Sequence, residues 1–115
     1  MYNKFGQFID GKWQSSANKE TYDVINPATE EIIGKASKAS PADVDKALKS
    51  AEKGFEVWKK VKPWERSKII RKIADEIRKK SEVFAKWMTL ETGKTLAEGE
   101  AETSAAADIF EWNAE

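Results

Sequence analysis

Two kinds of hydrophobic pattern follow one another along the chain. Short apolar runs separated by turn residues occupy the first part, and such runs are typical of strands. After Ser40 the apolar residues recur at intervals of three and four, which is the spacing of one helix face. The pattern predicts a β-rich part over residues 1–39 and a helical part over residues 40–115, without internal repeats.

The β-rich part is predicted to contain a hairpin and two further short strands. The hairpin covers residues 8–13, because the Asp-Gly pair at its centre tolerates the positive φ of a two-residue type I′ turn. Residues 22–25 and 31–36 are the other expected strands, with a turn at residues 26–30. Strands this short and this few need partners along their edges.

The helical part is predicted to form three to four helices. Each start is indicated by residues that bind free backbone N–H groups or fit the first turn. Gly93 is expected to end one helix in the left-handed conformation. The expected starts are Ser40 followed by Pro41, Pro63, Ser81 as a cap, and the Thr95–Glu98 capping box.

Apolar side chains are expected to pack inward from each helix. Trp58, Trp87 and Trp112 lie at helical spacing, so we interpret them as core residues rather than as a platform for stacking bases. The last helix is apolar on nearly all sides. Its clearly polar arc comprises only Glu100, Ser104, Asp108 and Glu111. A helix of this kind is normally buried, and little chain remains to bury it, which indicates an unfinished domain.

The composition excludes several classes of protein. Of the 115 residues, 40% are hydrophobic and 35% are charged, which is a globular balance. Lys and Arg number 20, and Asp and Glu also number 20, so the neutral chain has no general attraction for nucleic acid or anionic membrane. The absence of Cys and His excludes Ser–His and Cys–His nucleophile pairs and argues against a zinc site.

Targeting signals are not evident. Residues 1–12 lack the apolar segment of a signal peptide, and no apolar run approaches the roughly 20 residues of a membrane span. The basic stretch at residues 68–80 contains acidic residues as well, so we interpret it as a solvated helix face. We therefore expect a cytoplasmic protein without a nucleic-acid or membrane partner.

Glu102 is the carboxylate whose position is unusual. It falls within the apolar arc of the last helix, near Ile109 and Asn113. A buried carboxylate at this position needs a partner, a cation or a proton. A second-turn glutamate can instead be favoured by the helix dipole and stay half in solvent. The sequence leaves both interpretations open.

Gly93, Lys94 and Thr95 match the end of a phosphate-binding P-loop. The full motif needs another Gly five residues before Gly93, in a strand-to-helix turn. Met88 stands there, within a predicted helix. We therefore interpret the three residues as the end of one helix and the cap of the next.

Several motifs, in matching order and spacing, resemble the aldehyde dehydrogenase family over nearly the whole chain. They include YDVINPATE at residues 22–30, ADVDKA at residues 42–47 and LETGK at residues 90–94. The ending, which includes FEWNAE at residues 110–115, is most similar to the succinate-semialdehyde dehydrogenase branch.

The resemblance implies a mostly helical α/β fold. Residues 1–115 would form the N-terminal, incomplete part of a Rossmann-like NAD(P)-binding domain. The family oxidises aldehydes to carboxylic acids with a cysteine nucleophile, hydride transfer to NAD or NADP, and hydrolysis assisted by a glutamate. Succinate semialdehyde is the expected aldehyde.

The same resemblance implies that this chain acts only as a part of such an enzyme. It has no Cys, and the family's cofactor-phosphate glycine motif and general-base glutamate lie beyond Glu115, so no catalytic or cofactor-binding residue is expected here. Alone, the chain is expected to be inactive and to bind no cofactor. Its expected partner is the remainder of the enzyme chain, in a homo-oligomer. The alternative is a stand-alone helical interaction module derived from such an enzyme.

Two further site roles are implied by the family. In many members a monovalent cation lies between backbone near the match to Ile25 and an acidic residue that matches Glu102. The end of the last helix borders the aldehyde tunnel in the family, so Asn113 is expected to line it.

Overall fold

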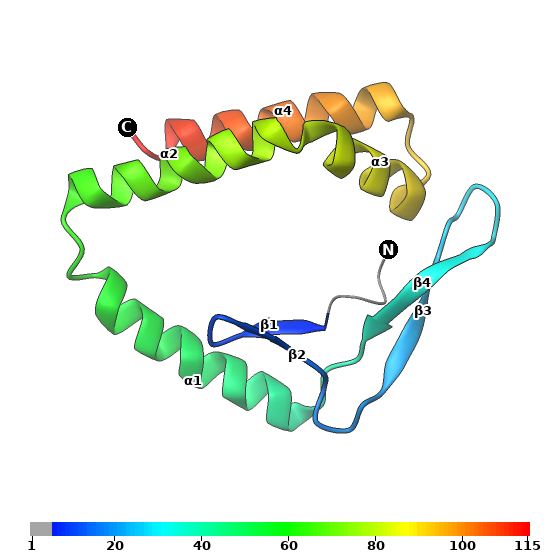
Figure 1. Cartoon of the computed structure of the whole chain (residues 1–115), viewed down its shortest axis with the longest axis horizontal. Coiled ribbons are helices and arrows are strands. Elements are labelled where there is room, and N and C mark those ends of the chain that lie inside the picture. The colour runs from blue at the N-terminus through cyan, green and yellow to red at the C-terminus, as the bar shows by residue number, and fades with distance from the viewer. Residues whose placement is uncertain (1–5) are drawn as a thin grey trace. The chain divides into compact units, whose positions relative to one another are not determined.

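Strands come first along the chain and four helices follow (Figure 1). The computed structural model describes residues 6–115, so residues 1–5 of the predicted β-rich part lie outside the described residues. The elements are β1 (Gln7–Ile9), β2 (Lys12–Gln14), β3 (Thr21–Ile25), β4 (Ile32–Ser37), α1 (Pro41–Trp58), α2 (Pro63–Lys79), α3 (Ser81–Thr92) and α4 (Leu96–Trp112). This is the small mixed α/β arrangement that the sequence predicts.

The chain divides into two compact units. The strand unit contains the residues up to Ile25 and Glu30–Lys60, and therefore includes α1. The helix unit contains Asn26–Thr29 and Val61–Glu115.

The hairpin at the start of the strand unit forms as predicted. Strand β1 pairs antiparallel with β2, and Phe8 lies opposite Trp13 with ring centroids 5.1 Å apart. Asp10 and Gly11 between them have φ values of 56° and 73°. Positive φ at both central residues is the requirement of a type I′ turn, whose twist matches that of the strands.

The second hairpin pairs β3 with β4, also antiparallel, with an irregularity between Val24 and Ile25. Within residues 6–115 the four strands make two separate two-stranded sheets. Two-stranded ribbons are marginal by themselves, so their stability depends on what packs against them.

Asp43 joins α1 to the loop that precedes β3. The Ser40 side chain caps the helix and Asp43 completes a capping box, with its Oδ2 accepting from the Ser40 N–H at 2.8 Å. The same carboxylate accepts the Ala17 N–H at 3.1 Å on both oxygens. The sequence predicted the helix start at Ser40, but not this contact between residues 26 positions apart.

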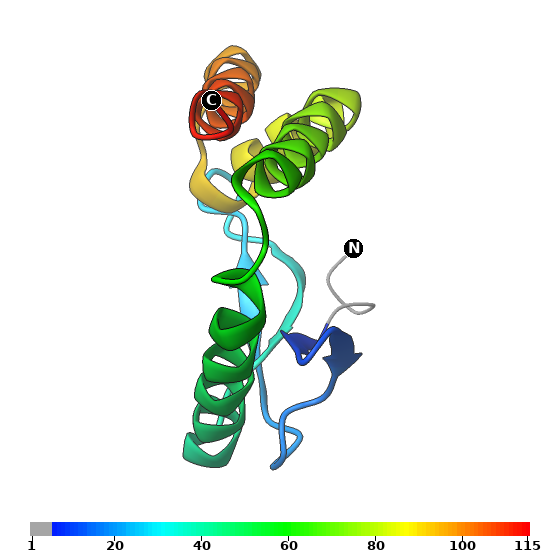
Figure 2. The same cartoon turned by 90° about the vertical axis from the view of Figure 1, so that its left-hand side faces the viewer.

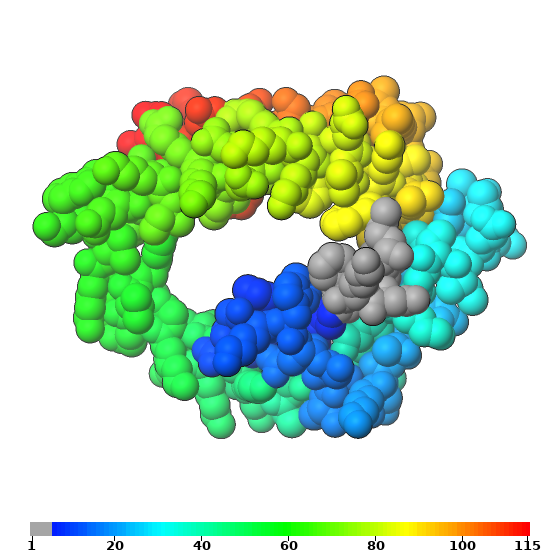
Figure 3. Space-filling model, in the orientation of Figure 1, coloured from blue at the N-terminus to red at the C-terminus, as the bar shows by residue number. Residues whose placement is uncertain are grey.

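The helix unit is built around small residues on α4, which lies along both α2 and α3 (Figure 2). Gly99 faces Ala85, and a Cβ on Gly99 would lie 2.8 Å from the Ala85 carbonyl oxygen. Thr103 and Ala107, one and two turns further on, are fully buried. Small side chains allow two helix backbones to approach closely. In the space-filling view the atoms of the three helices form an unbroken surface (Figure 3).

The boundaries of the last two helices follow from local chemistry. Gly93 ends α3 with φ 74°, and Thr95 caps α4 in a capping box with Glu98, as predicted. The prediction that Ser81 caps α3 is wrong. Lys80 is the cap of both α2 and α3, so Ser81 is already the first helical residue and its side chain has no free end to cap.

The interpretation of Trp58 and Trp112 as core residues is also wrong for the described chain. Trp112 is 82% exposed and Trp58 is 37% exposed. In the helix unit, which contains Trp112, the buried positions are small instead, because the close backbone approach leaves no volume for an indole. Those positions include Ala74, Ala85, Gly99, Thr103, Ala107 and Ala114.

Candidate functional site

Glu102 lies on the surface of α4, in an ion pair. Its side chain is 57% exposed, and Oε2 lies 2.5 Å from Nζ of Lys94. Of the two interpretations left open by the sequence, the structure supports the glutamate that is partly in solvent. The carboxylate nevertheless has a cation as its partner, namely the lysine ammonium.

The turn that contains Asn26 and Pro27 packs within the helix unit. Asn26 is buried, and its Oδ1 accepts the Ala28 N–H at 2.9 Å. A Cβ on Gly93 would lie 3.1 Å from Cγ of Pro27, so the turn contacts the end of α3 directly. Ile25 itself ends β3 in the strand unit and is half-exposed. A cation shared by Ile25 and Glu102 stays a prediction.

Asn113 is the C-terminal cap of α4. Its Nδ2 donates to the Ile109 carbonyl at 2.8 Å, and the same carbonyl accepts the Asn113 backbone N–H at 3.1 Å. The side chain is exposed. Its position at the end of α4 is clear, and its role in an aldehyde tunnel stays a prediction.

The Gly93–Thr95 segment has the geometry of two helix ends. Gly93 is left-handed, and the Thr95 hydroxyl accepts the Glu98 N–H at 3.3 Å. The segment follows a helix rather than a strand, and Met88 lies inside α3. This confirms the interpretation as a cap and excludes a P-loop.

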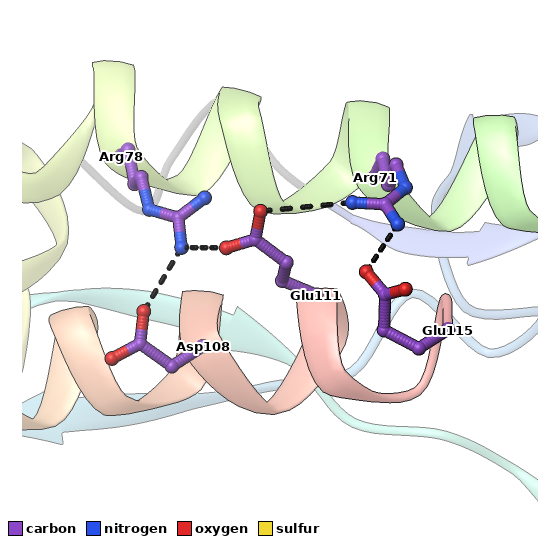
Figure 4. Close-up of polar contacts among 5 residues, drawn as sticks. All are labelled: Arg71, Arg78, Asp108, Glu111 and Glu115. Atoms are coloured by element: carbon purple, nitrogen blue, oxygen red, sulfur yellow. Dashed lines mark hydrogen bonds and ion pairs between the residues drawn. The ribbon is translucent and has the colours of Figure 1, made fainter.

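A set of ion pairs joins α2 to α4 (Figure 4). Arg78 Nη2 lies 2.9 Å from Asp108 Oδ1 and 2.5 Å from Glu111 Oε2. Arg71 contacts the other oxygen of Glu111 and also pairs with Glu115. The hydrogen bonds that Arg78 donates to Glu111 and then to Asp108 raise the pKa of Arg78 above its ordinary value. We call these five residues the α2–α4 ion network.

The sequence pattern does not reveal this network, because it shows Arg71 and Arg78 only as part of a basic helix face. Arg78 and Asp108 are 30 residues apart, and only the packing of α4 against α2 brings them together. The signal in the sequence was an acidic arc on α4 that matched a basic face on α2. Two of the arginines that could face nucleic acid are thus paired within the chain.

An apolar groove of about 390 Å³ lies on the helix unit. Its lining includes Ile77, Phe84, Trp87, Met88, Thr103 and Ala106.

Over residues 6–115 no group of three or more His, Cys, Asp or Glu side chains is close enough to bind a metal. No helix in this range is both long and apolar enough to cross a bilayer.

Comparisons with known proteins identify relatives along almost the whole chain. Residues 13–115 match the model of the aldehyde dehydrogenase family. The chain is 36% identical over 107 residues to succinate-semialdehyde dehydrogenase [NADP(+)] 2 of Schizosaccharomyces pombe. The matched region covers 93% of this chain and 22% of that protein.

Solved structures give the same result. Betaine aldehyde dehydrogenase of Staphylococcus aureus in complex with NAD⁺ superposes with a TM-score of 0.92 at 39% identity, over 95% of this chain and 22% of that one. A point mutant of the same enzyme, also in complex with NAD⁺, gives a TM-score of 0.91 over 23% of its length. The chain thus spans less than a quarter of these relatives and matches the N-terminal part of their fold. With its hairpins, its helix caps and its small-residue helix packing, this chain belongs to the aldehyde dehydrogenase family.

Proposed function

We propose that this chain is the N-terminal part of an NAD(P)-dependent aldehyde dehydrogenase and contributes to its cofactor-binding domain. The complete enzyme would oxidise an aldehyde, with succinate semialdehyde as the proposed substrate, to the carboxylic acid. NAD or NADP accepts the hydride when it is bound to the complete enzyme. The chain by itself has neither Cys nor His, so it is inactive alone.

The second apolar face of α4 is the observation that carries this proposal. Ala101, Ala105, Ile109 and Trp112 recur every three or four residues and therefore share one side of the helix. All four are exposed, with Ile109 at 62% and Trp112 at 82%. The other side, at Gly99, Thr103 and Ala107, already packs in the helix unit. A helix with two apolar faces needs a second neighbour, and in the proposal the rest of the enzyme supplies it.

The strand unit has uncovered apolar surface too. On α1, Val44, Leu48 and Phe55 recur at helical spacing and are 48%, 64% and 62% exposed. Contiguous apolar surface of this kind marks an interface in a soluble protein. Both units thus contribute surfaces that a larger enzyme would cover.

The proposed substrate rests on two similarities. The relative from Schizosaccharomyces pombe is a succinate-semialdehyde dehydrogenase, and the FEWNAE ending resembles that branch. The solved relatives are betaine aldehyde dehydrogenases, so the aldehyde must be tested directly.

Two measurements test the proposal. An antibody against this segment is used on denatured extracts of the source cells; a band several times larger than 13.0 kDa is expected. The protein in that band is then purified and assayed for NAD(P)H formation with succinate semialdehyde and with betaine aldehyde. Faster turnover of succinate semialdehyde is expected. A purified 115-residue chain that reduced NAD(P)⁺ would overturn the proposed inactivity.

The exposed faces of α1 and α4 also favour one alternative, a stand-alone interaction module derived from such an enzyme. This alternative requires a band near 13.0 kDa in the same blot and a chain that melts cooperatively by itself. The leading proposal instead expects the isolated chain to self-associate or to bind a hydrophobic dye.

A further inference from the structure

The turn of the first hairpin has an exposed aspartate directly before a glycine. Asp10 and Gly11 are both exposed, and both have positive φ. Asp10 is the only aspartate in the sequence that precedes a glycine, and no asparagine precedes one. Every other aspartate is followed by a residue whose side chain shields its backbone nitrogen. An unshielded pair of this kind therefore occurs once in the sequence, at the tip of a turn.

The side chain of Asp10 is held only weakly. Its Oδ1 accepts the Ser50 hydroxyl at 3.4 Å, which is longer than an ordinary O–H···O hydrogen bond. Asp43 is the contrasting case, because it is buried and accepts N–H groups from Ser40 and Ala17. The carboxyl group of Asp10 can therefore turn toward its own backbone without breaking a strong contact.

The backbone nitrogen of Gly11 is accessible to that carboxyl group. The pairing of β1 with β2 ends at Ile9 opposite Lys12, so the Gly11 nitrogen lies outside the ladder. A Cβ built on Gly11 would meet nothing within 4 Å, so the residue stands in open space. A nucleophilic nitrogen and an electrophilic carboxyl carbon are thus separated by few bonds, and closing them gives a five-membered ring.

We propose that Asp10 is a site of spontaneous isomerisation to isoaspartate, through a succinimide that the Gly11 nitrogen closes. This nitrogen bonds to Cγ of the Asp10 carboxylic acid, and one carboxyl oxygen leaves as water with the acid proton and the amide proton. Water then adds to the main-chain carbonyl carbon of Asp10, and the bond from that carbon to the Gly11 nitrogen breaks. The chain is now linked through Cγ. One water is released and one is consumed, and nothing is oxidised or reduced.

The product does not fit the turn. Isoaspartate adds one carbon atom to the backbone between Ile9 and Gly11. A two-residue type I′ turn needs fixed dihedral angles at both central residues, and the register of the hairpin follows from them. Isomerisation therefore disrupts the pairing of Phe8 with Trp13 and the burial of Ile9.

The test uses the natural protein that contains this chain, stored for several weeks at physiological temperature and neutral pH. Isoaspartate is located by peptide mapping, because a protease specific for aspartate does not cleave at isoaspartate. We expect it to accumulate at position 10 several-fold faster than at Asp45, which is exposed but followed by lysine within α1. Equal rates at the two positions would overturn the proposal.

Two variants that suit the same turn test the chemistry. Asp10→Asn keeps a preferred type I′ pair, and isoaspartate should form faster still, because a neutral amide is attacked more easily than a carboxylate. Asp10→Gly also suits the turn and removes the carbon that is attacked, so isoaspartate should be absent from position 10. The proposal fails if Asp10→Asn ages no faster than the wild-type protein, or if the wild-type signal persists in Asp10→Gly.

Hydrogen exchange of the stored protein tests the effect on the hairpin. Peptides with isoaspartate and with aspartate separate by chromatography, so exchange is measured for each form in one sample. The β1 and β2 amides should exchange several-fold faster in the isomerised form, with stored Asp10→Gly as the control for ageing alone. Equal exchange in the two forms would contradict the loss of the turn.

Discussion

The strand unit and the helix unit are held together by different kinds of contact. In the strand unit, turn and cap chemistry dominates, with the Asp10–Gly11 turn and the buried carboxylate of Asp43 as its fixed points. In the helix unit, close backbone packing at Gly99 and Ala85 dominates, with the α2–α4 ion network at its edge. The polar contacts described for the strand unit centre on a turn and a helix cap, including the Ala17–Asp43 hydrogen bond, whereas those described at the edge of the helix unit join the side chains of two helices.

The difference predicts how each unit responds to change. A unit built on caps and turns loses stability when a donor or an acceptor is removed. A unit built on close packing loses stability when volume is added. The following experiments test this contrast in the natural protein that contains the chain, with hydrogen exchange of α1 and α4 amides reporting each unit separately.

The largest effect is expected from Gly99→Ala, with Gly54→Ala as its matched control. The added methyl of Gly99→Ala meets the Ala85 backbone at 2.8 Å, so overpacking should destabilise the helix unit by about 1–3 kcal/mol. Gly54 on α1 has nothing within 4 Å, and Gly54→Ala should stabilise α1 by about 0.5–1 kcal/mol through helix propensity. Stabilisation by both substitutions would disprove the close approach of α3 and α4.

The next largest loss of stability is expected from Ser40→Ala and Thr95→Ala, which each disrupt one of the two capping boxes. Each removes a hydroxyl that accepts an N–H from the first helical turn, and each should cost about 1 kcal/mol. Ser40→Ala should also speed exchange of the Ala17 amide, because Asp43 loses one of the donors that orient it. Unchanged exchange at Ala17 would show that the loop is held independently of the cap.

Acid should weaken the strand unit through Asp43. Hydrogen bonds from the Ser40 backbone and hydroxyl hold the pKa of Asp43 below its ordinary value. A carboxylate with a lowered folded-state pKa stabilises the fold above its unfolded pKa, and that stabilisation is lost as the pH falls through the lower folded value. In melts recorded between neutral and acidic pH, Asp43→Asn should flatten the acid side of the profile. A profile with unchanged slope would contradict this role.

The smallest effect is expected from Arg78→Met. The substitution breaks the pairs with Asp108 and Glu111, which are exposed and therefore individually weak. Its destabilisation of the helix unit should be measurable at low ionic strength and vanish in 1 M salt, where the Debye length is about 3 Å. Lys68→Met on the same helix is the control for loss of one positive charge. An effect of equal size in the control would show that the network contributes nothing specific.

Much of the fold could be predicted from the sequence because its signals are local. The Asp-Gly pair predicted the first turn, Gly93 predicted the end of α3, and the Thr95–Glu98 pair predicted the start of α4. Each of these residues acts on backbone within a few positions, so the neighbouring residues are enough to predict the turn or the helix boundary. Ser81 failed as a cap because the break between α2 and α3 is a single residue long.

The candidate site was less accessible from the sequence. Periodicity located Glu102 on an apolar arc, but its pairing with Lys94 depends on how the Gly93–Thr95 segment turns. The family resemblance named Ile25 and Asn113, and no contact in either compact unit tests their roles. Resemblance transfers a role from a complete enzyme, whereas the contacts of this chain report only its own part.

The sequence by itself determined where the turns, caps and helices begin and end, and the residues of the family motifs. The tertiary structure decided which face of each helix is buried and which charges meet. Trp112 and Ala107 both lie on apolar sides of α4, yet only Ala107 is buried, because the approach of α4 to its neighbours admits small side chains alone. Arg78 meets Asp108 for the same reason. Hydrophobic periodicity gives the number of apolar faces, but the available neighbours determine which of them is covered.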